Sequence, residues 1–121
     1  MRWSVEEGIG RLMMDQPPSN TMTMQFFTEF RHWIDIVLNE TGLKAIILHG
    51  NGRHFSSGAD LNELLGNLDK QIMIENYRSL TMLEQMGIPV ISSIRGVCLG
   101  SAFELALFSN FRICADDAVE C

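Results

Sequence analysis

The chain has 121 residues, a length that suits one domain with a hydrophobic core. Hydrophobic residues make up 46% and charged residues 20%, as in typical globular proteins, and no apolar run approaches the roughly 18 residues that cross a membrane. The formal net charge is −6, and Lys and Arg do not cluster. We therefore expect no membrane span and no nucleic-acid partner, since the latter would need a basic face.

The cysteines do not predict a cross-linked or metal-bound protein. Cys98, Cys114 and Cys121 are odd in number and lack CxxC spacing, so we expect neither a disulfide framework nor a zinc site. The first residues carry an early acid and no apolar stretch, so we expect no signal peptide. Together these features predict a cytoplasmic protein with incidental thiols and no metal.

The first half of the chain predicts a strand pair followed by a helix. Residues 3–14 show strand character with a turn at Glu7-Gly8, and the tandem prolines after them predict a loop. The helix has Thr21 or Thr23 as its N-cap and Gly42 as its stop signal. Its apolar stripe has helical spacing and comprises Met24, Phe27, Phe30, Ile34, Val37 and Leu38.

The second half alternates strands with helices. Three strands are predicted, at residues 43–48 (buried on both faces), 89–94 and 111–114. Three helices are predicted, over 60–65 with Asp60 as N-cap, 70–86 with Met73, Tyr77, Leu80 and Leu83 on one face, and 100–108. This alternation is typical of right-handed βαβ units, so the predicted fold class is α/β.

Two loops follow buried strands and lead directly into helices. They comprise residues 50–61, the first loop, and residues 96–105, the second loop. In α/β folds ligands gather where strands end and where helix N-termini aim free N–H groups outward. Two such ends that face one point would form a two-donor pocket for a developing oxyanion.

These loops resemble the oxyanion motifs of the crotonase (enoyl-CoA hydratase/isomerase) superfamily. The first loop contains Phe55-Ser56-Ser57-Gly58-Ala59-Asp60-Leu61, and the second is framed by Ile88-Pro89-Val90-Ile91, Glu104-Leu105-Ala106 and Ala115-Asp116-Asp117-Ala118. The Pro18-x-Asn20 segment matches a weaker third feature. The resemblance covers essentially the whole chain and implies a crotonase-like (ClpP/crotonase) spiral of ββα units. It makes residues 1–121 the N-terminal portion of a single crotonase-like domain, with the C-terminal helical part absent from this chain.

The resemblance also implies roles for residues. It makes the main-chain N–H groups of Ala59 and Ser101 an oxyanion hole and Glu104 a catalytic acid or base. It implies an acyl-CoA thioester as substrate, no cofactor beyond the coenzyme A of that substrate, and a homo-oligomer (a trimer or hexamer). The implied CoA-binding positions are Ser57, Ala59, Asp60, Leu61, Asn62 and Ser101. Because the net charge repels CoA at long range, local cations are needed, and the candidates are Arg53, His54 and Lys70.

Three functions stay open at this point. Hydration of a 2-enoyl-CoA is the first, with Glu104 and a second glutamate that the resemblance places beyond Cys121. Double-bond isomerisation by Glu104 alone is the second. A non-catalytic truncated fragment is the third, because the family usually has glycine at Ser101 and Ala102 and aspartate at Asn110. Among apolar helix neighbours, Glu104 is either a buried carboxylate suited to proton transfer, an exposed helix charge, or the partner of an arginine.

Overall fold

The computed structural model describes residues 1–66 and 70–119. Its strands are β1 (Arg2–Glu6), β2 (Ile9–Met14), β3 (Ala45–Gly50), β4 (Val90–Ile94) and β5 (Phe111–Cys114). Its helices are α1 (Met24–Leu38), α2 (Leu61–Gly66), α3 (Lys70–Glu84) and α4 (Ser101–Leu107). The strands form one sheet in the order β1-β2-β3-β4-β5, with β1 and β2 antiparallel and the other neighbours parallel. The α/β prediction is confirmed.

The β1-β2 hairpin turns on two residues with positive φ. Glu7 has φ 52° and Gly8 has φ 81°, and the register that pairs Glu6 with Ile9 closes the turn. A two-residue turn of this kind suits the twist of an antiparallel pair. The predicted turn at Glu7-Gly8 is therefore confirmed.

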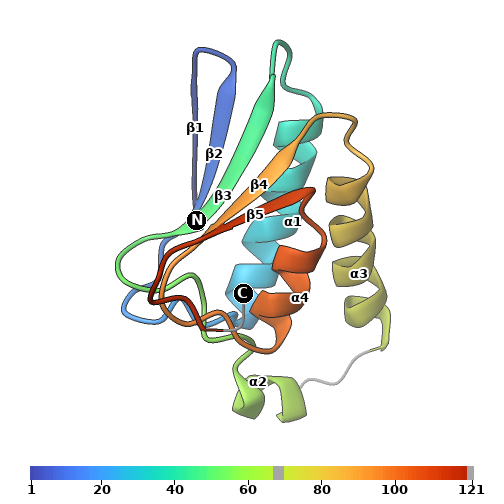
Figure 1. Ribbon diagram of the computed structural model, residues 1–121. Helices are drawn as coiled ribbons and strands as arrows, with labels where there is room; N and C mark the ends of the chain where they lie inside the picture. The colour runs from blue at the N-terminus through green and yellow to red at the C-terminus, as the bar shows by residue number, and fades with distance from the viewer. Residues whose placement is uncertain (67–69, 120–121) are drawn as a thin grey trace.

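One face of the sheet carries the core. Helices α1, α3 and α4 lie on that face, and α2 lies beyond one end of the sheet (Figure 1). Every second residue along β2, β3 and β4 is buried, and these residues include Leu12, Met14, Ile46, Leu48, Val90 and Ile94. The prediction that residues 43–48 are buried on both faces is wrong. Because the helices cover one face only, the alternate residues Ala45 and Ile47 stay half-buried.

Helix α1 begins where predicted, with side chains from two elements satisfying its first turn. Thr23 Oγ1 accepts a hydrogen bond from the Phe26 N–H at 3.1 Å, and Glu63 Oε2 of α2 accepts one from the Met24 N–H at 2.8 Å. These carboxylate and hydroxyl oxygens pair two N–H groups that have no acceptor inside the helix. Thr23 is thus the N-cap, and Glu63 holds α2 against the start of α1.

The apolar stripe of α1 differs in part from the prediction. Its buried residues are Phe26, Phe30, Ile34 and Val37, whereas Leu38 is exposed. Asn39 caps the helix after Leu38, so the helix ends before the predicted stop at Gly42. On α3, Leu83 is buried and Leu80 half-buried, but Tyr77 is 64% exposed. The side chain of Met73 lies outside the described residues.

Two further expectations concern membranes and thiols. None of the helices in residues 1–66 and 70–119 combines the length and the apolar character that a membrane span requires. Cys98 is fully buried. Cys114 is disulfide-bonded, so the expectation of incidental thiols is wrong for this residue, which ends an exposed strand. Cys121 lies outside the described residues.

Candidate active site

The two loops lie side by side through main-chain hydrogen bonds. The Phe55 N–H donates to the Arg95 carbonyl at 2.9 Å, and the Ser56 N–H donates to the Val97 carbonyl at 3.0 Å. The Leu99 N–H returns a bond to the Ser56 carbonyl at 3.2 Å. This short parallel ladder continues the sheet beyond β3 and β4. It brings the segments that contain Ala59 and Ser101 to the same end of the sheet.

The backbone of Ala59 is oriented by the segment on its other side. The Met22 N–H donates to the Gly58 carbonyl at 2.8 Å, and the Asp60 N–H donates to the Met22 carbonyl at 3.1 Å. In an extended segment successive residues direct their main-chain groups to opposite edges. The N–H of Ala59 therefore points away from Met22, and it has no hydrogen-bond partner among residues 1–66 and 70–119.

Gly58 allows the second loop to approach closely. A Cβ at this position would lie 2.6 Å from the Leu99 carbonyl oxygen and 3.5 Å from the Ser101 nitrogen. Its φ of +94° is also one that residues with a side chain rarely adopt. Contact and conformation together require glycine here.

Ser101 is the first residue of α4, so its N–H has no acceptor within the helix. Two of the following N–H groups are engaged, because Ala102 donates to the Leu99 carbonyl at 3.0 Å and Glu104 to the Gly100 carbonyl at 3.1 Å. No side chain caps this helix start. The Ser101 N–H is thus a donor at the positive end of a helix, and no acceptor binds it in the described part of the chain.

A cavity of about 360 Å³ joins the predicted catalytic residues. Ala59, Ser101 and Glu104 all line it, so residues from both loops and from α4 meet at one space. Most of its remaining wall is apolar and comes from α1, α3 and α4, with Phe26, Phe27, Phe30, Leu80 and Leu105 among the lining residues. A cavity of this size with few polar groups is typical of a small-molecule site.

Glu104 lines the cavity but is not buried. Helix α4 buries Ala102, Leu105 and Ala106, and Glu104 is exposed. Burial of the carboxylate is therefore not observed. In the described part of the chain no ion pair joins Glu104 to an arginine, so that alternative is not supported either. The carboxylate is free to face a ligand in the cavity.

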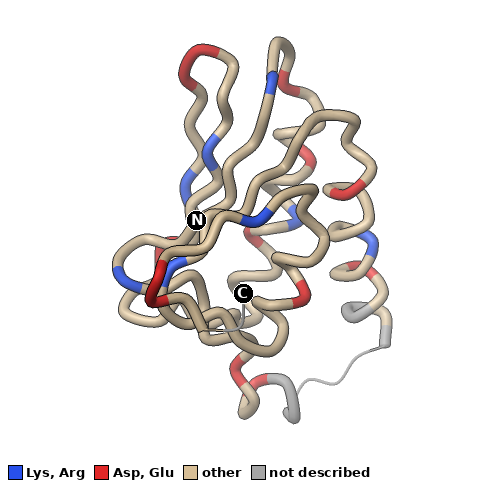
Figure 2. The backbone as a smooth tube through the Cα atoms, in the orientation of Figure 1, with Lys and Arg blue, Asp and Glu red and all other residues tan. Residues whose placement is uncertain are grey.

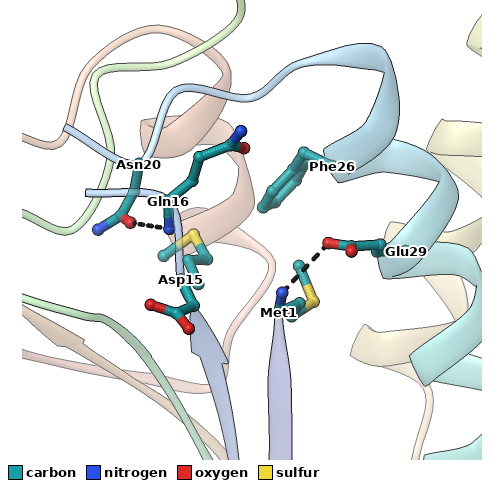
Figure 3. A pocket seen from close by; sticks show the side chains of 7 residues that line it. Met1, Asp15, Gln16, Asn20, Phe26 and Glu29 are labelled. Atoms are coloured by element: carbon teal, nitrogen blue, oxygen red, sulfur yellow. Dashed lines mark hydrogen bonds and ion pairs between the residues drawn. The ribbon is translucent and has the colours of Figure 1, made fainter. Parts of the chain in front are cut away.

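Asn20 is a buried residue that holds the first loop, and sequence reasoning gave it only a weak role. It is 1% exposed, and its Oδ1 accepts a hydrogen bond from the Gln16 N–H at 2.8 Å. Figure 3 shows this contact beside a hollow of about 10 Å³, close to the size of one water. Asn20 Nδ2 donates to the carbonyls of Asn51 at 3.1 Å and His54 at 2.9 Å. The side-chain amide of Asn20 thus joins the loop that contains the tandem prolines to the first loop.

Ser56 extends this network to the oxyanion position. Its side chain is fully buried, and its hydroxyl donates to the Asn20 carbonyl at 2.7 Å. The same oxygen accepts a hydrogen bond from the Gly58 N–H at 3.1 Å. The N–H of Gly58, one residue before Ala59, is therefore held by a buried side chain that is itself bonded to the main chain of Asn20. The Pro18-x-Asn20 segment was the signal for this network, but its partners are distant in the sequence.

The main-chain N–H groups at three of the predicted CoA-binding positions are engaged within the protein. The N–H of Ser57 donates to the Ser19 carbonyl at 2.9 Å, that of Asp60 to Met22, and that of Asn62 to Asp60 Oδ1 at 3.0 Å. Asp60 is therefore the N-cap of α2, as predicted. A ligand would therefore find no free main-chain N–H groups at Ser57, Asp60 and Asn62. Beside them, the Leu61 side chain is 68% exposed.

The candidate cations differ in what they can offer. Arg53 is exposed, but His54 Nδ1 accepts a hydrogen bond from the Val97 N–H at 3.0 Å, which makes His54 a bridge between the loops. The side chain of Lys70 lies outside the described residues. Figure 2 shows the Lys and Arg positions scattered among acidic ones, without a basic face in that view. Arg53 is thus the described candidate with no assigned structural bond.

The departures from the family pattern are accommodated. Asn110 Oδ1 accepts from the Val90 N–H at 2.8 Å, and the Asn110 N–H donates to the Val90 carbonyl at 2.8 Å. An amide oxygen can accept this bond as a carboxylate would. Ala102 is fully buried on the sheet side of α4. At Ser101 the side chain replaces a hydrogen but leaves the N–H in place.

The architecture around this cavity is that of the crotonase fold. An enoyl-CoA hydratase/isomerase from Xanthobacter autotrophicus Py2 matches it with a TM-score of 0.87 at 26% sequence identity, over 97% of this chain and 46% of that one. The family model described as enoyl-CoA hydratase/isomerase matches residues 4–119. The chain belongs to the enoyl-CoA hydratase/isomerase family.

Two curated relatives indicate the range of activities near this sequence. A probable enoyl-CoA hydratase of Bacillus subtilis is 34% identical over 95% of this chain. A peroxisomal Delta(3,5)-Delta(2,4)-dienoyl-CoA isomerase of Arabidopsis thaliana is 30% identical over 98% of it. The chain spans 46% and 48% of the lengths of these relatives, or about half.

Proposed function

We propose that the protein carrying this chain binds an acyl-CoA thioester and stabilises its enolate. The thioester carbonyl oxygen would lie between the N–H groups of Ala59 and Ser101. Charge that develops on this oxygen is stabilised by donors that need no reorganisation, and losing one such donor costs roughly 3–4 kcal/mol in other enzymes. Main-chain groups near Ser57 and from Asp60 to Asn62 would hold the adenine and the pantetheine of CoA.

One observation carries this proposal. Two main-chain donors and one carboxylate, contributed by the first loop and by α4, line a single cavity with largely apolar walls. An acyl chain is apolar and its thioester needs donors, so both parts of the ligand find complementary surroundings.

Hydration of a 2-enoyl-CoA is the first proposed reaction. Water adds at C3 while a proton is delivered to C2, and the intermediate charge passes through the thioester oxygen. Glu104 would exchange a proton with the water or with C2. A second carboxylate is needed to handle the other proton, and the family resemblance supplies it from outside residues 1–121.

Isomerisation of the double bond is the second candidate, and one observation favours it. Among the described residues, Glu104 contributes the one carboxylate that lines the cavity. A single base that removes a proton from one carbon and returns it to another can move a double bond without a second carboxylate. The isomerase among the relatives supports this alternative.

The substitution Glu104→Gln tests the role of the carboxylate. It should lower kcat by about 10²-fold or more, the scale of general acid–base catalysis, with little change in KM. Loss of crotonyl-CoA measures hydration, and conversion of a 3-enoyl-CoA to its 2-isomer measures isomerisation. Glu84→Gln, on the exposed end of α3, is the matched control. Turnover within a few-fold of wild type would exclude Glu104 as the acid or base.

The assembly is also a proposal. We propose a homo-oligomer, because exposed apolar side chains at Leu107, Phe111 and Ile113 leave surface that association could cover. Light scattering on the protein at several concentrations tests this, and a monomer at all of them would contradict it.

A further inference from the structure

One polar side chain interrupts the apolar part of the cavity wall. Helix α3 contributes Asn76, Tyr77 and Leu80 to the lining, opposite the phenylalanines of α1. The ring of Tyr77 is engaged edge-on with Phe108, with centroids 5.9 Å apart. Asn76 belongs to neither loop and to no role in the proposed enolate chemistry. Its amide is therefore an unassigned group in the site.

Arg31 of α1 determines which way this amide faces. The Arg31 guanidinium donates a hydrogen bond to Asn76 Oδ1. A guanidinium has only donors, so the amide must turn its oxygen toward Arg31 and its NH₂ group away. Nδ2 has no hydrogen-bond partner in residues 1–66 and 70–119. The orientation of Asn76 is thus fixed by chemistry rather than by a choice between equivalent flips.

An amide donor that faces the cavity would discriminate between acyl groups. A plain alkyl chain that fills the cavity would remove water from the NH₂ group and offer it no acceptor, which is unfavourable. An acyl group with an oxygen at the same place would accept the hydrogen bond. A site built around such a bond rejects analogues that lack the acceptor much more strongly than it rejects small changes in chain length.

We propose that Asn76, oriented by Arg31, is a specificity-determining residue that selects acyl groups bearing an oxygen acceptor beyond the reacting carbons. The preferred substrates are acyl-CoA thioesters with a hydroxyl, carbonyl or carboxylate on the acyl chain, rather than simple alkenoyl chains. This inference rests on the proposed function, because it assumes that the cavity holds the acyl group.

The experiment compares two substrates of equal size. 2-Hexenoyl-CoA with a terminal hydroxyl and 2-heptenoyl-CoA contain the same number of non-hydrogen atoms. The wild-type protein should favour the hydroxylated substrate by about 10-fold or more in kcat/KM. Asn76→Leu, which is nearly the same size without polar atoms, should abolish or reverse this preference. Gln25→Leu, on the exposed side of α1, is the matched control and should keep it.

Two further variants protect the test against a simple folding defect. Asn76→Asp keeps an acceptor for Arg31 but has no N–H, so the preference should also disappear. Arg31→Met frees the amide, so the preference should shrink while turnover of 2-heptenoyl-CoA changes little. A preference that survives both Asn76 substitutions would overturn the inference.

Binding separates this inference from the proposed reaction. Calorimetric Kd values for the saturated counterparts, hexanoyl-CoA with a terminal hydroxyl and heptanoyl-CoA, report the preference without any turnover. A preference in Kd without turnover supports Asn76 and contradicts the reaction. Turnover of both enoyl substrates without a preference contradicts Asn76 and leaves the reaction standing. Absence of binding by both thioesters overturns the two together. A carboxylated analogue that binds more tightly than the hydroxylated one would identify the acceptor as anionic.

Discussion

The two loops that supply the proposed donors are held in different ways. The first loop is fixed by buried side chains, Asn20 and Ser56, whose partners come from distant parts of the sequence. The second loop is held by main-chain bonds to the first, by the start of α4, and by the side chains of His54 and Asp117, which accept bonds from its main-chain N–H groups. The Ala59 donor therefore depends on side-chain identity elsewhere in the protein. The Ser101 donor depends on the contacts between the loops and on the start of α4 rather than on the side chain of Ser101 itself.

This difference has a functional consequence. A fixed first loop can act as the template, because the second loop takes its position from it through Ser56 and Gly58. Damage to the first loop should displace both donors, whereas a side-chain change in the second should displace neither. Substitutions can test this asymmetry directly.

Among substitutions that leave every main-chain N–H in place, the largest effect is expected at the contact between the loops. Gly58→Ala would place a methyl group 2.6 Å from the Leu99 carbonyl oxygen and push the second loop away. We expect kcat/KM for crotonyl-CoA to fall by about 10²-fold or more, because the N–H groups of Ala59 and Ser101 would no longer point at the same thioester oxygen. Gly52→Ala is a close control, since Gly52 also has positive φ (+90°) but no atom within 4 Å of a new Cβ. Equal losses in the two variants would show that backbone strain, not the contact, matters.

The next effect concerns the anchor of the first loop. Asn20→Asp keeps an acceptor for the Gln16 N–H but cannot donate to the carbonyls of Asn51 and His54. Leaving these groups unpaired beside a new carboxylate should lower the free energy of unfolding by about 2–4 kcal/mol in urea denaturation. Asn39→Asp, at the exposed end of α1, should cost less than about 1 kcal/mol. If the two substitutions lowered the free energy of unfolding by similar amounts, Asn20 would not be the anchor of the first loop.

A third test uses pH, because Asp15 holds the first loop through Asn51. The Asn51 amide donates to Asp15 at 2.7 Å and, with the nearby Arg2, holds the pKa of Asp15 below its usual value. The folded carboxyl binds its proton less tightly than the unfolded one, so its contribution is complete above the unfolded pKa and is lost as pH falls through the folded pKa. Acidification below about pH 4 should thus lower the urea midpoint less in Asp15→Asn than in wild type. If the urea midpoint fell equally with pH in the two proteins, Asp15 would not be the group whose protonation weakens the first loop.

The sequence predicted those features that depend on neighbouring residues. The turn at Glu7-Gly8 and the N-caps Thr23 and Asp60 are local signals, and the structure confirms them. The network around Asn20 could not be predicted in the same way, because its amide reaches carbonyls 31 and 34 residues away. The order of the strands in the sheet determines which loops lie next to each other, and this order cannot be predicted from a local sequence pattern.

The sequence also predicted only in part which residues of α1 are buried in the core. Helical spacing identified Phe30, Ile34 and Val37 correctly, but Phe26 replaced Met24 in the core and Leu38 stayed exposed. The predicted stripe has the observed helical spacing but differs at both ends of the helix. The reason is that the elements packed against α1 determine which of its faces is buried. Asn76 was missed for a related reason. A polar residue in a helix looks exposed until a neighbouring helix places Arg31 and a cavity beside it.

The smallest effect is expected for the side chain of Ser101, because the proposal assigns the role of this residue to its main-chain N–H. Ser101→Gly keeps the N–H and restores the residue that the family resemblance leads one to expect, so kcat/KM should stay within a few-fold of wild type. Ser101→Pro is the informative counterpart, since proline is tolerated at the first position of a helix but has no N–H. It should lower kcat by about 10²- to 10³-fold while the circular dichroism spectrum and urea midpoint stay close to those of wild type. If Ser101→Gly and Ser101→Ala both abolished turnover in folded protein, the hydroxyl would be the reacting group. The backbone account of the second donor would then be wrong, and the contrast between the loops would disappear with it.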